Sequence, residues 1–506
     1  MTSKAEYEAS IAEKDQQIAA LRHELNELKR LLFGSKSEKQ TTVSLDPKQL
    51  DLGFDPSEAT ALDQLEQEVI SYKRKKKKAH PGRTALPDHI PTEEVIIEPA
   101  NLSEDMELIG EEVTEVLDYK PGVLLKRRYI RRRYALRSSA SENKDQAEIV
   151  IAPMPSRPIQ KGIPEPGLLA HIMVAKYVDH LPFYRQIKQF ERNHGWIIHK
   201  STINDWFAAT CSLLKPLYEL LKKRVIESDY LQADESTIKV LERPKKTKST
   251  SRKSDKKIHL GYQWVFRNAL NGLVLFSYRK GRGANGIMEL LSDFSGYLQS
   301  DGYSAYKTYL SKHPDVRGVS CLAHIRRKFF EAKDNDPVNA QLALDIIGYL
   351  YLIEAHCRDR KRSSEDRLAV RQRLSLPVYR ALTDWVEYQH KNNLSSGAIG
   401  KAYYYANNEL PKLVACFEDG RLELDNNLIE NSIRPLALGR KNYLFAGSQK
   451  GAERAAMMYS FFASCKKLDV NPWEWLKDIL TRIADHPINR LEELLPHKWK
   501  AEESEE

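Results

Sequence analysis

The sequence lacks the features that would place the chain in a membrane or in a disulfide-bonded secreted class. Its 506 residues contain no run of about 18 apolar residues, the length that a membrane-spanning helix needs. The first ten residues, MTSKAEYEAS, have neither the basic nor the apolar region of a secretion signal. The five cysteines are scattered, odd in number and free of any C-x-x-C pair, which argues against a disulfide framework or a four-cysteine zinc site. We therefore expect a soluble, cytoplasmic protein with no membrane partner and with reduced, mostly buried cysteines.

An excess of acidic residues is also lacking, because the formal net charge is +9 and the positive charge is clustered. The clusters are KRKKKK at 73–78, KRRYIRRRYALR at 126–137 and RPKKTKSTSRKSDKK at 243–257. Basic segments that contain tyrosine, serine or threonine are typical of contact with a phosphate backbone. Each run taken alone is equally consistent with a solvated loop.

The first 152 residues predict three short modules. Ile11, Ile18, Leu25 and Leu32 recur every seven residues, which predicts a coiled coil over 1–33 and hence self-association. A helix that packs onto its own protein is the alternative. Residues 34–92 are polar and lysine-rich without periodicity, as in a linker. Residues 93–152 alternate β-branched, aromatic and charged residues, which predicts a small β module with a basic face.

A helical domain is predicted over 153–228, after a segment rich in proline. Helical periodicity begins at Leu168, and the turn NHGW places Gly195 between two helical stretches. With Ser201 or Thr202 as N-cap, the second helix would begin near 202, as in a helix-turn-helix that binds DNA. A plain helical spacer is the alternative.

The rest of the chain predicts a multidomain α/β architecture. Three strand-like segments in a meander are followed by strands and helices in alternation over 229–332, the order of a mixed sheet. Residues 333–420 are helical in pattern and resemble an insertion, before a last part of the core at 421–460 and a C-terminal helical element at 461–506. The predicted core is thus discontinuous in sequence.

Three carboxylates are candidates for metal binding. Asp234 lies inside the apolar strand YLQADESTIKVL, where an unpaired buried charge would cost several kcal/mol. Asp301 lies where the strand of LQSDGYSAY ends, and Glu430 lies on a predicted helix facing the sheet. Each alone is also explained as a turn or cap residue. Together, their hard oxygen atoms suit Mg²⁺ or Mn²⁺, and two such ions support phosphoryl transfer.

The sequence segments around these acids, and others over nearly the whole chain, resemble those of one family of transposases. The resemblance is to the insertion sequence 66 family, which belongs to the acid-triad group of transposases. Its segments are LQADES, LQSDGYSAY, CLAHIRRKFFEA, ENSIRPLALGRKNYLFAGS and DILTRIADHPINRLEELLPHKW. Two further segments are similar to the same family: LKRLLFGSKSEK and GLLAHIMVAKYVDHLPFYRQ.

The resemblance implies an RNase H-like catalytic core, interrupted by a helical insertion, in which Asp234, Asp301 and Glu430 hold two Mg²⁺ or Mn²⁺ ions. It also implies a zinc-binding module near the N-terminus, but residues 93–152 contain no cysteine, so zinc there is doubtful. Cys321-x-x-His324 resembles a Cys/His pair of such transposases, yet it supplies only two ligands, so a structural role is favoured over a metal site.

The implied function is two-metal cleavage of DNA at the ends of an insertion sequence, followed by strand transfer. The implied partners are the element ends, target DNA, a second or further copy of the chain, and accessory proteins of the same element, in a bacterial, nucleoid-associated setting. A catalytically silent DNA-binding relative and a metal-dependent nuclease that does not join strands are the alternatives. Predicted DNA contacts come from the basic β module and from the segment after Glu430: Lys126, Arg127, Arg128, Arg131, Arg132, Arg133, Arg434, Arg440 and Lys441.

Overall fold

The computed structural model describes residues 122–130, 133–135, 149–151, 153–242, 257–392 and 397–500. The chain divides into two units, residues 54–130 and the remainder, 1–53 with 131–506. The predicted coiled coil (1–33) and linker (34–92) lie outside the described residues. In the smaller unit, 122–130 have neither helix nor strand. In the larger unit, β1 (Arg133–Ala135) pairs antiparallel with β2 (Ile149–Ile151), so two short strands of the predicted β module are present.

Three helices follow the proline-rich segment: α3 (Pro166–Tyr177), α4 (Phe183–His194) and α5 (Lys200–Ile226). The predicted turn is confirmed, because α4 ends at Gly195, which has a left-handed φ of 63° and donates its N–H to Glu191 O. The predicted N-cap of α5 is wrong. His199, with extended backbone, is the N-cap, and Ser201 and Thr202 lie within the first turn.

A five-stranded mixed sheet forms the centre of the larger unit, in the order β5-β4-β3-β6-β7. Neighbours β3, β4 and β5 are antiparallel, whereas β6 and β7 are parallel to β3. The predicted meander followed by strand–helix alternation is therefore confirmed. The elements of this part are β3 (Tyr230–Glu242), β4 (Lys257–Asn268), β5 (Val274–Arg279), α6 (Asn285–Leu290), β6 (Gly296–Gln299), α7 (Ser304–Lys312) and β7 (Val316–Val319).

Helices from the C-terminal part complete the core: α13 (Asn427–Tyr443), α14 (Gln449–Lys467), α15 (Pro472–Arg482) and the 3₁₀ helix η4 (Ile488–Leu494). Helix α14 closes the outer edge of β5. The buried hydroxyls of Ser464 and Ser460 accept the N–H groups of Val274 and Phe276, at 2.9 and 2.8 Å. Side-chain oxygens thus satisfy backbone donors that an edge strand would otherwise leave unpaired.

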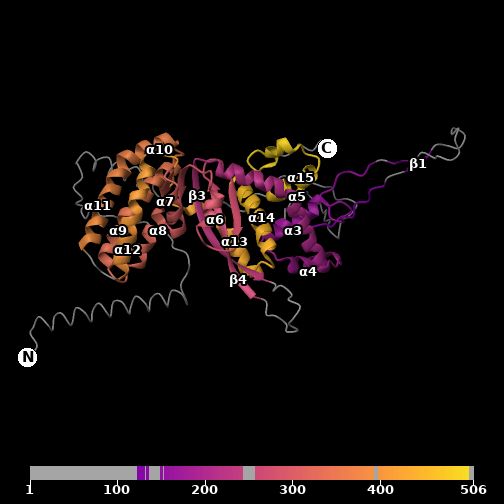
Figure 1. The fold of residues 1–506 in the computed structure, drawn as a ribbon, viewed down its shortest axis with the longest axis horizontal. Coiled ribbons are helices and arrows are strands. Elements are labelled where there is room, and N and C mark those ends of the chain that lie inside the picture. Colours follow the sequence, from indigo (N-terminus) through magenta and orange to yellow (C-terminus); the bar gives the residue numbers. More distant parts are fainter. Residues whose placement is uncertain are drawn as a thin grey trace, which may run out of the picture. The chain divides into compact units, whose positions relative to one another are not determined.

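The segment predicted as an insertion is helical, and its described residues contain no strand. After α8 (Leu322–Glu331) it comprises α9 (Pro337–Asp359), α10 (Ser364–Val370), the π-helix η2 (Arg371–Ser375), α11 (Leu376–Asn392), α12 (Ala398–Glu409) and the 3₁₀ helix η3 (Leu410–Phe417). Figure 1 shows these helices gathered apart from α3, α5, α14 and α15, with the sheet between the two groups. No described helix combines the length and the apolar character needed to cross a bilayer.

Candidate active site

The register of two parallel strands explains why Asp234 and Asp301 meet. Gln232 on β3 is paired with Gln299, the last residue of β6. Each aspartate follows its glutamine by two residues, so the 67-residue separation of the glutamines is also that of the aspartates. Because β6 ends at Gln299 while β3 continues, Asp301 lies in the turn after its strand and Asp234 within its strand. The two acids therefore occupy corresponding positions on neighbouring strands.

The turn that carries Asp301 is fixed from three sides. Its Oδ1 accepts the N–H of Tyr303 at 3.0 Å, an arrangement that aspartate favours in turns. Its backbone oxygen accepts the hydroxyl of Tyr405, from α12, at 2.7 Å. Gly302 has φ of 80°, and a Cβ atom there would lie 3.0 Å from the carboxylate of buried Glu409. The helical insertion therefore holds the second acid in place.

Glu430 enters the site from the first turn of α13, as the sequence predicts for a helix facing the sheet. The residue before this helix, Asn426, is fully buried and anchors it to the core. Its side-chain amide donates to Ala233 O at 3.0 Å, next to Asp234, and its N–H bonds Cys321 Sγ at 3.2 Å. The helix that carries the third acid is thus tied directly to the strand that carries the first.

The charges of the neighbouring acids act on the ionisation of Asp234. Burial raises the pKa of Asp234 well above its usual value, and the negative charges of Glu235, Asp301 and Glu430 raise it further. The N–H of Glu235, which Asp234 Oδ1 accepts at 2.7 Å, offsets only part of this. A carboxylate that is costly to ionise among other acids is a strong candidate for a cation ligand.

Glu235 is a fourth acid that the sequence interpretation did not single out. Its side chain is 4% exposed, forms an ion pair with Arg282 and accepts the hydroxyl of Tyr306 at 3.3 Å. Desolvation raises its pKa, although Arg282 opposes the rise. Arg282 lies 3.7 Å from the ring centre of Tyr303, in the Asp301 turn. Successive strand residues face opposite sides, so Glu235 supports the turn from the far side of the sheet.

The Cys321-x-x-His324 pair divides into two roles. Cys321 is buried and accepts a backbone N–H, which accords with the predicted structural role; all five cysteines are free and buried, as predicted. His324 Nε2 lies 3.8 Å from Glu430 Oε1, and its buried Nδ1 has no hydrogen-bond partner. Burial lowers the pKa of His324 despite the nearby carboxylates of Glu430 and Asp301. His324 therefore lies beside the acids, although the sequence interpretation gave it no role in the site.

The donor set suits a hard divalent cation. Among the described residues, no three His, Cys, Asp or Glu side chains lie close enough to hold an ion as they stand. The chemistry of the site nevertheless fits: a positive ion would relieve the unfavourable ionisation of Asp234 beside Asp301 and Glu430. Carboxylate oxygens are the ligands that Mg²⁺ and Mn²⁺ prefer.

The predicted DNA-contacting cations fall into three structural groups. Arg434 and Lys441 on α13 are exposed, as are Lys126, Arg127 and Arg128 in the smaller unit. The Nη1 atom of Arg440 donates to Ser236 Oγ and to Thr237 O, at 3.0 and 2.6 Å, which joins α13 to β3. Arg131 and Arg132 lie outside the described residues, and only the backbone of Arg133 is described.

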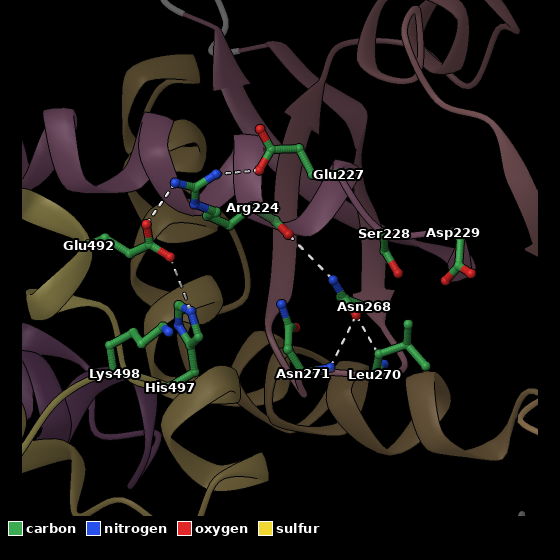
Figure 2. A pocket seen from close by; sticks show the side chains of 10 residues that line it. All are labelled: Arg224, Glu227, Ser228, Asp229, Asn268, Leu270, Asn271, Glu492, His497 and Lys498. Carbon is green, nitrogen blue, oxygen red and sulfur yellow. Dashed lines mark hydrogen bonds and ion pairs between the residues drawn. The ribbon is translucent and has the colours of Figure 1, made fainter. Parts of the chain in front are cut away.

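A cavity of about 500 Å³ lies at the other end of β3, beside Ser228 and Asp229. Its charged groups bind one another, as Figure 2 shows: Arg224 pairs with both Glu227 and Glu492, at 2.5 and 2.6 Å. The amide of Asn268 donates to Arg224 O at 3.3 Å. These contacts join the end of α5 to the sheet and to the C-terminal element, and the cavity contains none of the three acids.

Comparisons with known proteins place the chain among the transposases. Residues 161–454, more than half of the chain, match the model described as the Transposase IS66 family. Residues 460–497 match the IS66 C-terminal element, and residues 20–95 match a model described as Transposase C of IS166 homeodomain. The chain belongs to the IS66 family of transposases.

Full-length relatives support this membership. Three proteins of Sinorhizobium fredii, described as uncharacterized proteins y4jD, y4hP and y4qI, are 35%, 30% and 30% identical to this chain. The alignments cover 96% of this chain in each case, and 95%, 89% and 90% of the respective relatives. The likeness therefore extends beyond the segment around the acids.

Proposed function

We propose that this protein cleaves DNA at the ends of an insertion sequence and joins the resulting ends to target DNA. The observation that carries the proposal is the direct pairing of Gln232 with Gln299, two residues before Asp234 and Asp301, together with the charges of Asp301 and Glu430, which raise the pKa of Asp234. Membership of a transposase family supplies the class of substrate.

The three acids would hold two ions of the Mg²⁺ or Mn²⁺ type. When bound, such ions activate an attacking oxygen and stabilise a leaving oxygen in phosphoryl transfer. The chain's own contribution is positional. The bonds of Tyr303 and Tyr405 hold Asp301, and the Asn426 anchor holds the helix of Glu430 against the strand of Asp234.

DNA would contact exposed cations on α13 and in residues 126–128. Arg434 lies about one helical turn after Glu430, so a phosphate bound by it would lie close to that acid, whereas Lys441 lies about three turns from Glu430. The match to a homeodomain over 20–95, the basic residues 126–128 and the helices α4 and α5 supply candidates for recognising the element ends. Cleavage of two ends requires at least two copies of the chain, for which the heptads of 1–33 offer a contact.

The test is a cleavage and joining assay with the full-length protein. Labelled duplexes carrying the element ends are incubated with a target plasmid and Mg²⁺, with Asp301→Asn as the inactive variant. Asp315→Asn is the matched control, because Asp315 is exposed and precedes β7, at the opposite edge of the sheet. We expect cut and joined products from the wild type and the control, and neither from Asp301→Asn.

Other outcomes would favour the alternatives. Cut ends without joined products would identify a nuclease, and DNA binding without cutting, with either metal, would identify a silent relative. Equal activity of wild type and Asp301→Asn would refute the assignment of the acids.

A further inference from the structure

We propose that Gln232 and Gln299 form a buried tie that positions all three acids, so that they govern metal affinity without contacting metal or DNA. The inference rests on the proposed function, because it concerns the same site. It arises from a motif that occurs twice in the sequence: Asp234 and Asp301 each end an LQ-x-D motif, in LQADES and LQSDGYS.

The two glutamines contact each other inside the core. Both are fully buried, and they are directly paired in the parallel register of β3 and β6. Gln232 Nε2 donates to Gln299 Oε1 at 2.9 Å, and the hydroxyl of Tyr230 donates to the same oxygen at 2.6 Å. The hydrogen bond between the two side chains therefore helps to fix the register of β3 and β6, two residues before each aspartate.

The same pair also reaches the segment that leads into α13. Gln299 Nε2 donates to Glu423 O at 2.7 Å and to Ser320 O, after β7, at 3.2 Å. Gln232 Nε2 lies 3.4 Å from Asp425 O. Residues 423–426 lead directly into the helix of Glu430. The glutamine pair thus links the strand of the first acid, the strand of the second and the approach to the third.

Glutamine is the side chain that this position demands. Gln299 uses its oxygen for two donors and its nitrogen for two backbone carbonyls, and so employs most of the hydrogen-bonding capacity of an amide. An apolar side chain of the same length would leave buried groups of Tyr230, Ser320 and Glu423 without these partners. The segment before α13 would then be free to shift relative to the sheet, and Glu430 with it.

The chain offers a matched control for a purely structural effect. Gln263 on β4 is also fully buried in this sheet, and its amide donates to Ala452 O of α14 at 3.0 Å. Among the described residues, its side chain makes no hydrogen bond with the segments that carry the acids. Gln299→Met, Gln232→Met and Gln263→Met each remove one buried amide of similar size, but only the first two break the tie.

The experiment measures three quantities for each full-length variant: unfolding in urea, Mn²⁺ binding followed by electron paramagnetic resonance, and the Mg²⁺ dependence of end cleavage. We expect Gln299→Met and Gln232→Met to weaken Mn²⁺ binding and to lower the cleavage rate at fixed Mg²⁺ by roughly 10- to 100-fold, the usual effect of removing a partner that orients metal ligands. Affinity for end DNA without metal should stay within about twofold, because both glutamines are fully buried and cannot contact DNA. Gln263→Met should lose less stability, because the Gln263 amide makes one hydrogen bond and its buried oxygen has no partner, and it should keep wild-type metal dependence.

Each result decides the matter. Wild-type Mn²⁺ binding and cleavage in Gln299→Met, or an equal loss in Gln263→Met, would overturn the positioning role. If the wild type binds Mn²⁺ but does not cut DNA, the proposed activity fails, while the comparison of Mn²⁺ affinities still tests the tie. If the wild type does neither, the proposed function fails and the positioning role is overturned with it.

Discussion

Replacing Gly302 with alanine tests how rigidly the second acid is held. A non-glycine residue with a left-handed φ, here 80°, costs roughly 1–2 kcal/mol. The added Cβ would also lie 3.0 Å from the Glu409 carboxylate, which Lys307 and Lys412 hold at 2.9 and 2.8 Å. This contact adds a smaller penalty, while alanine lowers the entropy of the unfolded chain and recovers about 0.4–1 kcal/mol. We expect a net loss of about 1–2 kcal/mol in the free energy of unfolding.

The loss should be accompanied by a functional defect larger than the stability change explains. Because Gly302 adjoins Asp301, a displaced turn would move a metal-binding carboxylate, and cleavage should fall by at least tenfold while the protein remains folded. Urea unfolding and the end-cleavage assay measure the two effects. Gly447→Ala is the control, since nothing lies within 4 Å of a Cβ atom there and its φ is not left-handed. A Gly302→Ala protein with wild-type stability and cleavage would refute the claim that this turn requires glycine.

Three further predictions concern charge and the helical insertion. Asp234→Asn should stabilise the metal-free protein at neutral pH, because burial raises the pKa of Asp234 and its ionisation therefore destabilises the folded state. The gain in stability should vanish below about pH 4, where the carboxyl is protonated in the unfolded chain as well. Urea unfolding from pH 4 to 8 measures this gain, and a gain that grows toward acid pH would contradict the prediction. Arg371→Met should cost about 3–5 kcal/mol, because it strips the fully buried Glu354 of its bidentate partner, at 2.6 and 2.8 Å; a loss under about 1 kcal/mol in urea unfolding would refute that role. Tyr405→Phe should remove the bond to Asp301 O, with a cost of about 1 kcal/mol and slower cleavage, and unchanged values of both would show that α12 does not steady the turn.

The placement of the acids was accessible from sequence because local patterns carried it. The strand-like patterns placed Asp234 inside an apolar strand and Asp301 after another, whereas the choice of these two acids with Glu430 as a set rested on the resemblance to a transposase family. The mixed sheet and the strand-free insertion followed from the order of elements. The repeated LQ-x-D word could also have pointed to a buried glutamine pair, since equal spacing before two acids suggests equal register.

Features that depend on long-range packing could not be obtained in this way. The approach of His324 to Glu430, 3.8 Å across 106 residues of chain, depends on how α8 and α13 pack. The inward bonds of Arg440 depend on the distance between α13 and β3, whereas the sequence shows only a cation near a candidate acid. The true N-cap of α5 was missed because His199 makes no side-chain cap bond, so the usual preference for serine or threonine pointed to Ser201 and Thr202 instead.

The closure of β5 by α14 restricts how copies of this chain can assemble. An uncovered edge strand invites a strand from another molecule, which leads to sheet extension, domain exchange or aggregation. Here the hydroxyls of Ser460 and Ser464 accept the outward-facing N–H groups of β5. The hydroxyl of Tyr218 donates to Phe276 O at 2.6 Å. An incoming strand would have to displace a buried helix before it could pair. Any multimer of this chain must therefore use surfaces other than the β5 edge of the sheet.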